Sequence, residues 1–324
     1  MILIYLLLIA GFSVLLVKAT DILTDSLQRL AEITKLGKFA ITSLLLALAT
    51  SMPELVVSVT AALSGKSDLA LGTIIGSNIA DISLVIGGAA VIGGSFSIAG
   101  EFIKIDIFSV FLGAVMPLML LLDNQLSRMD GLILLLIYGM YNFSLLNKRV
   151  DRPAGNQGKL LRRMWQTNNR RRAEKWLAWL FLGAAMLMFS ADMIIKAGVA
   201  VAKLAGVPIF LIGLFFVAVG TSLPELSFEI GAVKRKQVGM VLGDLFGSVV
   251  ANSTLILGIV ALINPIKLEA GLNAYLLAAA AFGVMFLLFW LFVKTKKKLE
   301  RWEGLVLIAV YLAFAMMEWG ASAP

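Results

Sequence analysis

The sequence has 324 residues, of which 60% are hydrophobic and 15% are charged, and its mean hydropathy is +0.94. Soluble domains are nearer half apolar and a quarter charged, so this composition excludes an ordinary soluble protein. The chain has no Cys and no His, which excludes disulfides, thiolate chemistry and His-assisted catalysis. The remaining ligands are carboxylate, hydroxyl, amide and carbonyl oxygens, which suit Ca²⁺, Mg²⁺, Na⁺ or protons.

Hydrophobic segments follow one another along the whole chain. A segment of about 20 residues crosses a hydrocarbon layer of about 30 Å, and the first segment lacks the basic start of a cleavable signal peptide. We therefore predict an all-α membrane protein with ten transmembrane helices. They cover residues 2–17, 38–63, 69–94, 106–122, 129–146, 176–195, 208–232, 239–263, 271–293 and 303–319.

The longest polar stretch, residues 147–175, divides the chain into two five-helix units, 1–146 and 176–324. With both termini outside the cell, 23 of the 28 Lys and Arg residues fall in cytoplasmic loops, as the positive-inside rule requires. We therefore predict a multi-pass protein of the cell membrane with external termini and a cytoplasmic 147–175 linker. The basic linker orients the chain, and a second interpretation is binding to anionic lipid headgroups. The basic residues that give the net charge of +8 lie between apolar segments. We therefore expect a lipid bilayer as partner and no nucleic acid or protein partner.

The two units carry a repeated sequence. Ala-Thr-Ser-Met-Pro-Glu-Leu at 49–55 resembles Gly-Thr-Ser-Leu-Pro-Glu-Leu at 220–226, an offset of 171 residues. The same offset, without gaps, aligns Asp21 with Asp192, Gly76-Ser77 with Gly247-Ser248 and Gly87 with Gly258. A unit with an odd number of spans places its second copy upside down in the membrane. Inverted repeats are typical of secondary transporters, whose binding site lies near the midplane where the repeats meet.

The first motif places a proline and a glutamate in the middle of a hydrophobic span of each repeat. Pro53 and Pro224 cannot donate a backbone hydrogen bond, so each helix should kink or break there and release carbonyl oxygens. Glu54 and Glu225 follow at once, and an ionised Glu at this depth costs several kcal/mol unless it is paired. Two such carboxylates would match the charge of Ca²⁺. The alternative is a proline kink with a protonated, hydrogen-bonded Glu.

The second motif runs from Gly72 to Asp81 and from Gly243 to Asn252. Glycines four residues apart permit close helix packing. Packing alone does not explain the polar side chains, because Ser77 and Asp81 are four residues apart on one helix face, as are Ser248 and Asn252. Their oxygen atoms would complete a coordination shell around the two glutamates.

With both motifs, and with five spans on each side of a linker, the sequence resembles the sodium/calcium exchanger family. The resemblance implies that Glu54 and Glu225, with the carbonyls of Thr50 and Thr221, hold Ca²⁺. It also implies that further oxygens hold Na⁺ or are shared between the ions, and that Asp81 and Asn252 occupy central positions. These further ligands are Ser51, Ser77, Asp81, Ser222, Ser248, Asn252 and the carbonyls of Ala47 and Ala218.

The second repeat carries two acids that the first repeat lacks. Asp244 corresponds to Thr73, and Glu229 corresponds to Ser58. As accessory groups they could adjust which ion is coupled; alternatively, they could be solvated at a water-filled rim. They leave open whether the partner ion is Na⁺ or H⁺.

We therefore expect an antiporter, not an enzyme, that exchanges Ca²⁺ for Na⁺ by alternating access without a cofactor. A proton-coupled exchanger that uses Glu54, Glu225 and Asp81 is one alternative, and a cation channel is another. An intramembrane hydrolase would need a His to activate Ser222, and the chain has none. No glycine-rich nucleotide loop of the Walker type is present, so an ion gradient would supply the energy.

Overall fold

The computed structural model describes residues 2–34, 50–98, 106–149, 167–268 and 273–322, and they are mostly helical. The first half contains α1 (Ile2–Thr34), α3 (Met52–Leu63), α4 (Ser67–Ala80), η1 (Asp81–Val85), α5 (Ile86–Gly88), η2 (Ala89–Gly93), α7 (Asp106–Leu120), η3 (Leu121–Asp123) and α8 (Arg128–Arg149). The second half contains α10 (Thr167–Ala205), α11 (Ile209–Leu211), η4 (Ile212–Val217), α12 (Ala218–Thr221), α13 (Leu223–Lys234), α14 (Val238–Val250), η5 (Ala251–Ile256), α15 (Leu257–Ile263), α16 (Asn273–Lys296) and α17 (Arg301–Ser322).

Seven helical segments among the described residues are long and apolar enough to cross a membrane. Two shorter apolar helices cover Met52–Leu63 and Val110–Asp123. The expected span 38–63 begins outside the described residues, so only its second part can be compared. The expected span 2–17 agrees with the apolar part of α1, Ile2–Ala19, and the helix itself continues to Thr34. Hydropathy marks the part of a helix that faces lipid, and polar residues of good helix propensity then extend it.

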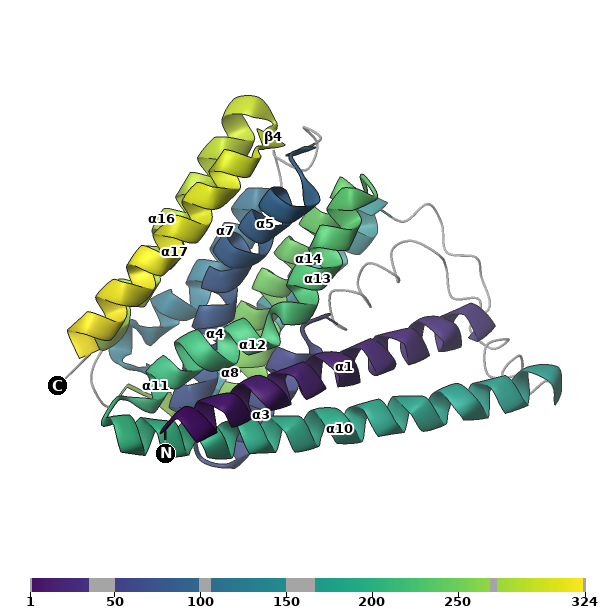
Figure 1. The fold of residues 1–324 in the computed structure, drawn as a ribbon, viewed down its shortest axis with the longest axis horizontal. Coiled ribbons are helices and arrows are strands. Elements are labelled where there is room, and N and C mark those ends of the chain that lie inside the picture. Colours follow the sequence, from purple (N-terminus) through teal and green to yellow (C-terminus); the bar gives the residue numbers. More distant parts are fainter. Residues whose placement is uncertain (1, 35–49, 99–105, 150–166, 269–272, 323–324) are drawn as a thin grey trace.

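The helices form two groups around a central bundle (Figure 1). The long helices α1 and α10 lie side by side along one edge, and α16 and α17 form a pair at the opposite edge. The pairing of α1 and α10 is antiparallel, since the guanidinium carbon of Arg29 near the end of α1 lies 5.8 Å from the ring centre of Trp176 near the start of α10. Between these groups lie α4, α12, α13 and α14, which carry both motifs.

The 171-residue offset seen in the sequence recurs in the backbone. The bounds of α3 and α13 differ by 171 at both ends, and α1 and α10 end 171 residues apart. The turn after each motif helix repeats as well, with left-handed φ values of 70° at Gly65 and 58° at Lys236. The two halves therefore share matching helix bounds and an equivalent turn at this offset.

Glycine contacts hold the two copies together. A Cβ on Gly76 would collide with the backbone carbonyl of Leu214, so α4 and η4 pack with their backbones in contact. Such contacts between helices require residues without a side chain. The same device recurs where Gly87 meets Gly304 and where Gly258 meets Gly131. This finding agrees with the packing role expected for Gly72 and Gly76, whereas a Cβ on Gly243 would meet nothing within 4 Å.

Two short antiparallel strand pairs join loops of different halves. β1 (Phe96–Ser97) pairs with β4 (Lys298–Leu299), and β2 (Gln125–Leu126) pairs with β3 (Ile266–Lys267). The helices that follow β2 and β4 start alike, because the Asp130 carboxylate accepts the Ser127 N–H at 2.8 Å and the Glu303 carboxylate accepts the Glu300 N–H at 2.8 Å. Each acid satisfies a backbone donor at its helix start, as in a capping box.

At the second of these helix starts, hydrogen bonds from Trp302, Lys296 and Lys298 lower the pKa of Glu300 to about 2. The loop between α16 and α17 therefore carries a compact network of exposed charges.

Candidate ion-binding site

Each motif proline stands next to a break in its helix. Ser51 (φ −78°, ψ 7°) precedes α3 and Ser222 (φ −82°, ψ 4°) precedes α13, and neither has a helical ψ. Pro53 and Pro224 occupy the first turn after each break, where a missing N–H costs least. The interruption predicted from the sequence is therefore present at equivalent points of both repeats.

The two breaks bring polar groups of both halves together. Glu54 and Glu225 are both buried. The Ser77 hydroxyl lies 3.4 Å from the Glu54 Oε1 atom, to which it donates, and 3.4 Å from the hydroxyl of Thr221. Glu54 and Ser77 come from the first half and Thr221 from the second, so the structure joins three residues that the sequence assigned to one site.

The residues of the second motif lie on the helices next to the two breaks, α4 with η1 and α14 with η5. Ser77, Asp81, Ser248 and Asn252 are all buried. The helix widens to a π-helix at Asp81–Val85 and, in the other half, at Ala251–Ile256. Single π-turns inside α-helices are frequent at functional sites. The serines thus lie on regular helix while Asp81 and Asn252 lie on the widened turns.

Asp244 and Glu229, the two additional acids of the second repeat, are buried. The Thr50 hydroxyl donates to the Asp244 Oδ1 atom at 2.9 Å, and Asp244 and Glu229 are only 2% and 1% exposed. The interpretation of these residues as solvated rim groups is therefore wrong for this conformation. The sequence shows that a helix carries an acid but not which face is covered by the other repeat.

Ala47 and Ala218 were predicted to offer their backbone carbonyls to an ion. Ala47 lies outside the described residues. The Ala218 carbonyl accepts hydrogen bonds from the Ser222 N–H at 3.0 Å and from the Thr221 hydroxyl at 3.1 Å. Both hydrogen bonds compete with a cation for the Ala218 carbonyl oxygen.

The site is rich in buried oxygen atoms that have no hydrogen-bond partner. They are Ser51 Oγ, Glu54 Oε2, Asp81 Oδ1, Ser222 Oγ, Glu225 Oε2, Glu229 Oε2, Asp244 Oδ2, Ser248 Oγ and Asn252 Oδ1, with Ser58 Oγ and Asn78 Oδ1 nearby in sequence. Buried polar atoms are normally paired. Within the described ranges no Lys or Arg is buried, so no base neutralises these carboxylates.

This distribution of oxygens indicates the kind of ligand. No group of three or more acidic side chains forms a ready metal cluster among the residues described. A cation would instead be held by carboxylates spaced among hydroxyl, amide and carbonyl oxygens, a mixed set suited to hard ions.

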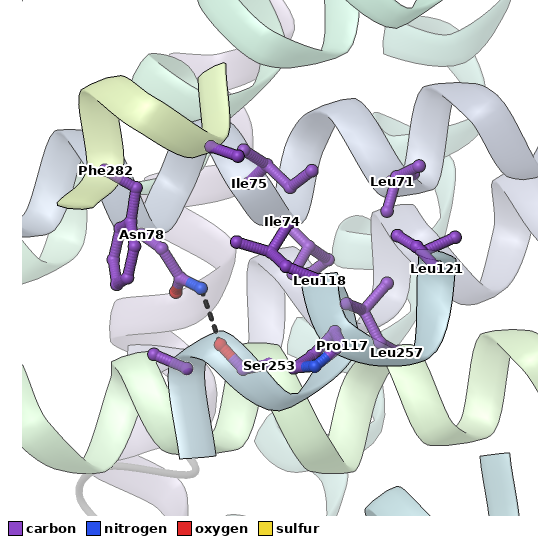
Figure 2. Close-up of a pocket in the computed structure, with 12 residues that line it drawn as sticks. Leu71, Ile74, Ile75, Asn78, Pro117, Leu118, Leu121, Ser253, Leu257 and Phe282 are labelled. Atoms are coloured by element: carbon purple, nitrogen blue, oxygen red, sulfur yellow. Dashed lines mark hydrogen bonds between the residues drawn. The ribbon is translucent and has the colours of Figure 1, made fainter. Parts of the chain in front are cut away.

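Asn78 lies in the second motif but was not among the site residues predicted from the sequence. Its amide Nδ2 donates to the Ser253 hydroxyl at 2.7 Å, which links α4 to η5 across the two halves. Its position directly after Gly76-Ser77, inside the second motif, could have indicated a role in the site. Figure 2 shows this pair beside a narrow pocket of about 20 Å³, lined mainly by apolar residues such as Ile74, Leu118 and Phe282. An apolar lining does not suit an ion, so this pocket is distinct from the polar centre.

The described helices and their buried polar centre define a multi-pass membrane protein with ion-binding chemistry. Comparison with known proteins agrees: the family model described as sodium/calcium exchanger protein matches residues 4–146 and 175–320. The chain belongs to the sodium/calcium exchanger family.

Relatives extend over most of the chain. The sodium/calcium exchanger MaX1 of Methanosarcina acetivorans is 28% identical over 97% of each chain. The inner membrane protein YrbG of Escherichia coli is 30% identical over 81% of each chain. Among solved structures, the sodium–calcium exchanger NCX_Mj soaked with Na⁺ and Sr²⁺ has 25% identity and a TM-score of 0.65, covering 97% of this chain and 98% of that one. The family supports exchange of cations, including Ca²⁺, across a membrane.

Proposed function

We propose that this protein is a secondary antiporter that exchanges Ca²⁺ for Na⁺ by alternating access. The observation that carries the proposal is the set of buried, unpaired oxygens around two equivalent helix breaks, with no buried Lys or Arg among the described residues to neutralise it. Unpaired carboxylates in the membrane cost free energy, which a bound cation offsets. Occupation by either ion offsets the negative charge of the central glutamates and permits reorientation, whereas the empty, charged site resists it.

In this proposal Glu54 and Glu225, with the carbonyls of Thr50 and Thr221, hold Ca²⁺. The hydroxyls of Ser51, Ser77, Ser222 and Ser248 hold Na⁺ at flanking positions, with the carbonyls of Ala47 and Ala218. Asp81 and Asn252 lie between the two kinds of position. The meeting of Glu54, Ser77 and Thr221 supports a site shared by both repeats.

The architecture we propose has ten spans in two inverted repeats, 1–146 and 176–324, joined by the 147–175 linker on the cytoplasmic side. Contacts between loops support it. With ten spans, β1 and β4 fall on one side of the membrane and β2 and β3 on the other, and the observed pairs respect this. The Ser67 hydroxyl likewise donates to the Asn264 carbonyl at 3.0 Å, and both belong to the outer side.

The partner ion is proposed to be Na⁺ because the four serines are placed symmetrically. A dehydrated Na⁺ needs several oxygens, and hydroxyls supply them without adding charge. Coupling to H⁺ is the second candidate, and the burial of Asp244 and Glu229 is the observation that favours it, since buried carboxylates can carry protons.

The test is uptake of ⁴⁵Ca²⁺ into proteoliposomes that contain the purified protein. We expect uptake when Na⁺ is trapped inside and diluted outside, and little uptake without a Na⁺ gradient. Uptake driven by an imposed pH gradient in Na⁺-free buffer, with no stimulation by Na⁺, would replace Na⁺ by H⁺. Absence of Ca²⁺ flux under both gradients would reject the function.

A further inference from the structure

Two buried acids of the second repeat, Glu229 and Asp244, lie next to the polar centre on its α13–α14 side. On α13, Glu229 follows Glu225 by four residues, and on α14, Asp244 precedes Ser248 by four. Because α13 and α14 are packed and joined by a short turn, both steps lead from the centre toward that turn. Four residues advance a helix by about 6 Å, so Glu229 and Asp244 lie at a common level, one turn from Glu225.

Electrostatic and hydrogen-bond contacts connect this level to the centre. Asp244 and Asp81 are both close enough to Glu229 to interact with its charge. Asp244 in turn accepts the hydroxyl of Thr50, at the helix break of the other repeat. The Glu229 Oε2 and Asp244 Oδ2 atoms are buried without a hydrogen-bond partner, so each carboxylate keeps one oxygen available for a ligand.

The first repeat has no such pair. By the 171-residue offset, Ser58 stands in place of Glu229 and Thr73 in place of Asp244. The Thr73 hydroxyl is used inside its own helix, where it donates to the Leu69 carbonyl at 2.8 Å. The extra charge therefore lies on one side of the centre, the side of the α13–α14 turn.

Charge balance indicates what this pair accommodates. Glu54, Asp81 and Glu225 at the centre and Glu229 and Asp244 beside it are all buried. If all five are ionised, a single Ca²⁺ leaves three negative charges uncompensated in the membrane, whereas a second leaves one. Buried charge of this kind is costly unless it is paired.

We propose that Glu229 and Asp244, with the Thr50 hydroxyl, form a second divalent-cation site on the α13–α14 side. This inference rests on the proposed function, because it takes the central site as a Ca²⁺ site. Carboxylate and hydroxyl oxygens are ligands that Ca²⁺ prefers. The second site gives the exchanger different ion occupancy on its two sides.

The test is Ca²⁺ binding stoichiometry, measured by equilibrium dialysis with ⁴⁵Ca²⁺ on the full chain in lipid nanodiscs without Na⁺. We expect two Ca²⁺ per wild-type chain and one in Glu229→Gln or Asp244→Asn. Glu225→Gln should also bind one, and Glu225→Gln/Glu229→Gln should bind none. Ser58→Ala, at the equivalent position of the first repeat, should bind two. Thermal unfolding without Ca²⁺ checks that each variant is folded, and two variants of the pair keep the test informative if one misfolds.

The outcomes separate the two proposals. One Ca²⁺ per wild-type chain that Glu229→Gln and Asp244→Asn do not change would overturn the second site and leave the central site standing. Equal loss in Glu225→Gln, Glu229→Gln and the double variant would also overturn it, since all would then act on one site. No Ca²⁺ binding by wild type would reject the proposed function itself.

Discussion

Glu54 and Glu225 occupy the same place in the two repeats but have different surroundings. Glu54 accepts a long hydrogen bond from Ser77, while both carboxylates keep a buried oxygen without a partner. A carboxylate that served only structure would be expected to use both oxygens in hydrogen bonds. The geometry therefore favours ion ligands over the alternative of protonated, structural glutamates at two proline kinks.

We predict that Glu54→Gln and Glu225→Gln each abolish exchange in a protein that remains folded. Gln keeps the shape of the side chain but removes the charge, and losing a charged contact weakens binding by roughly 10- to 100-fold. Size-exclusion chromatography checks folding, and ⁴⁵Ca²⁺ flux in proteoliposomes measures activity. Near-normal flux in either variant would remove that glutamate from the site.

We predict that Ser77→Ala and Ser248→Ala weaken the dependence of exchange on Na⁺ more than they weaken Ca²⁺ binding. Each removes one neutral oxygen, and a hydrogen bond of that kind contributes about 0.5–1.5 kcal/mol, or roughly 2- to 10-fold in half-saturating Na⁺. Flux is measured against Na⁺ concentration at fixed Ca²⁺. Ser64→Ala, in the exposed turn after α3, is the matched control. An unchanged Na⁺ dependence in both site variants would favour H⁺ coupling.

At the scale of elements, the sequence predicted what depends on local chemistry. Pro53 and Pro224 predicted the two breaks, because a missing N–H acts within one helix. The π-turn at Asp81 was not predicted, since it depends on how η1 packs against α13 and α17. The burial of Asp244 was missed for the same reason, as Thr50 of the other repeat covers it.

We predict that Gly76→Ala destabilises the protein, because the added Cβ would meet the Leu214 carbonyl and the Ala218 side chain. Forcing an extra carbon into packed backbone costs about 1–3 kcal/mol. Thermal unfolding in detergent measures the effect. Gly139→Ala is the control, since a Cβ there has no described neighbour within 4 Å. Equal melting temperatures for the two variants would contradict the close packing of α4 on η4.

At the scale of the molecule, the backbone supports a duplicated unit more strongly than the sequence does. The sequence offered two motifs and scattered identities at one offset. The structure adds equal helix bounds in α3 and α13 and equivalent turns after them. The direction of each unit relative to the membrane is predicted from the positive-inside distribution of Lys and Arg in the sequence.

The last prediction tests that direction with one matched pair of positions. Lys66 and Gln237 are 171 residues apart, and both are exposed in the turn that follows a motif helix. If the units are inverted and both termini are external, Lys66 faces outside and Gln237 faces the cytoplasm. Single cysteines can be introduced at either position, because the chain has none of its own.

In intact cells, a membrane-impermeant thiol reagent should label Lys66→Cys but leave Gln237→Cys unlabelled. Permeabilised cells should show labelling of both, which confirms that both cysteines are accessible. Labelling of Gln237→Cys alone in intact cells would reverse the orientation but keep the inversion. Equal labelling of both in intact cells would reject the inverted arrangement, because two equivalent turns would then lie on the same side of the membrane.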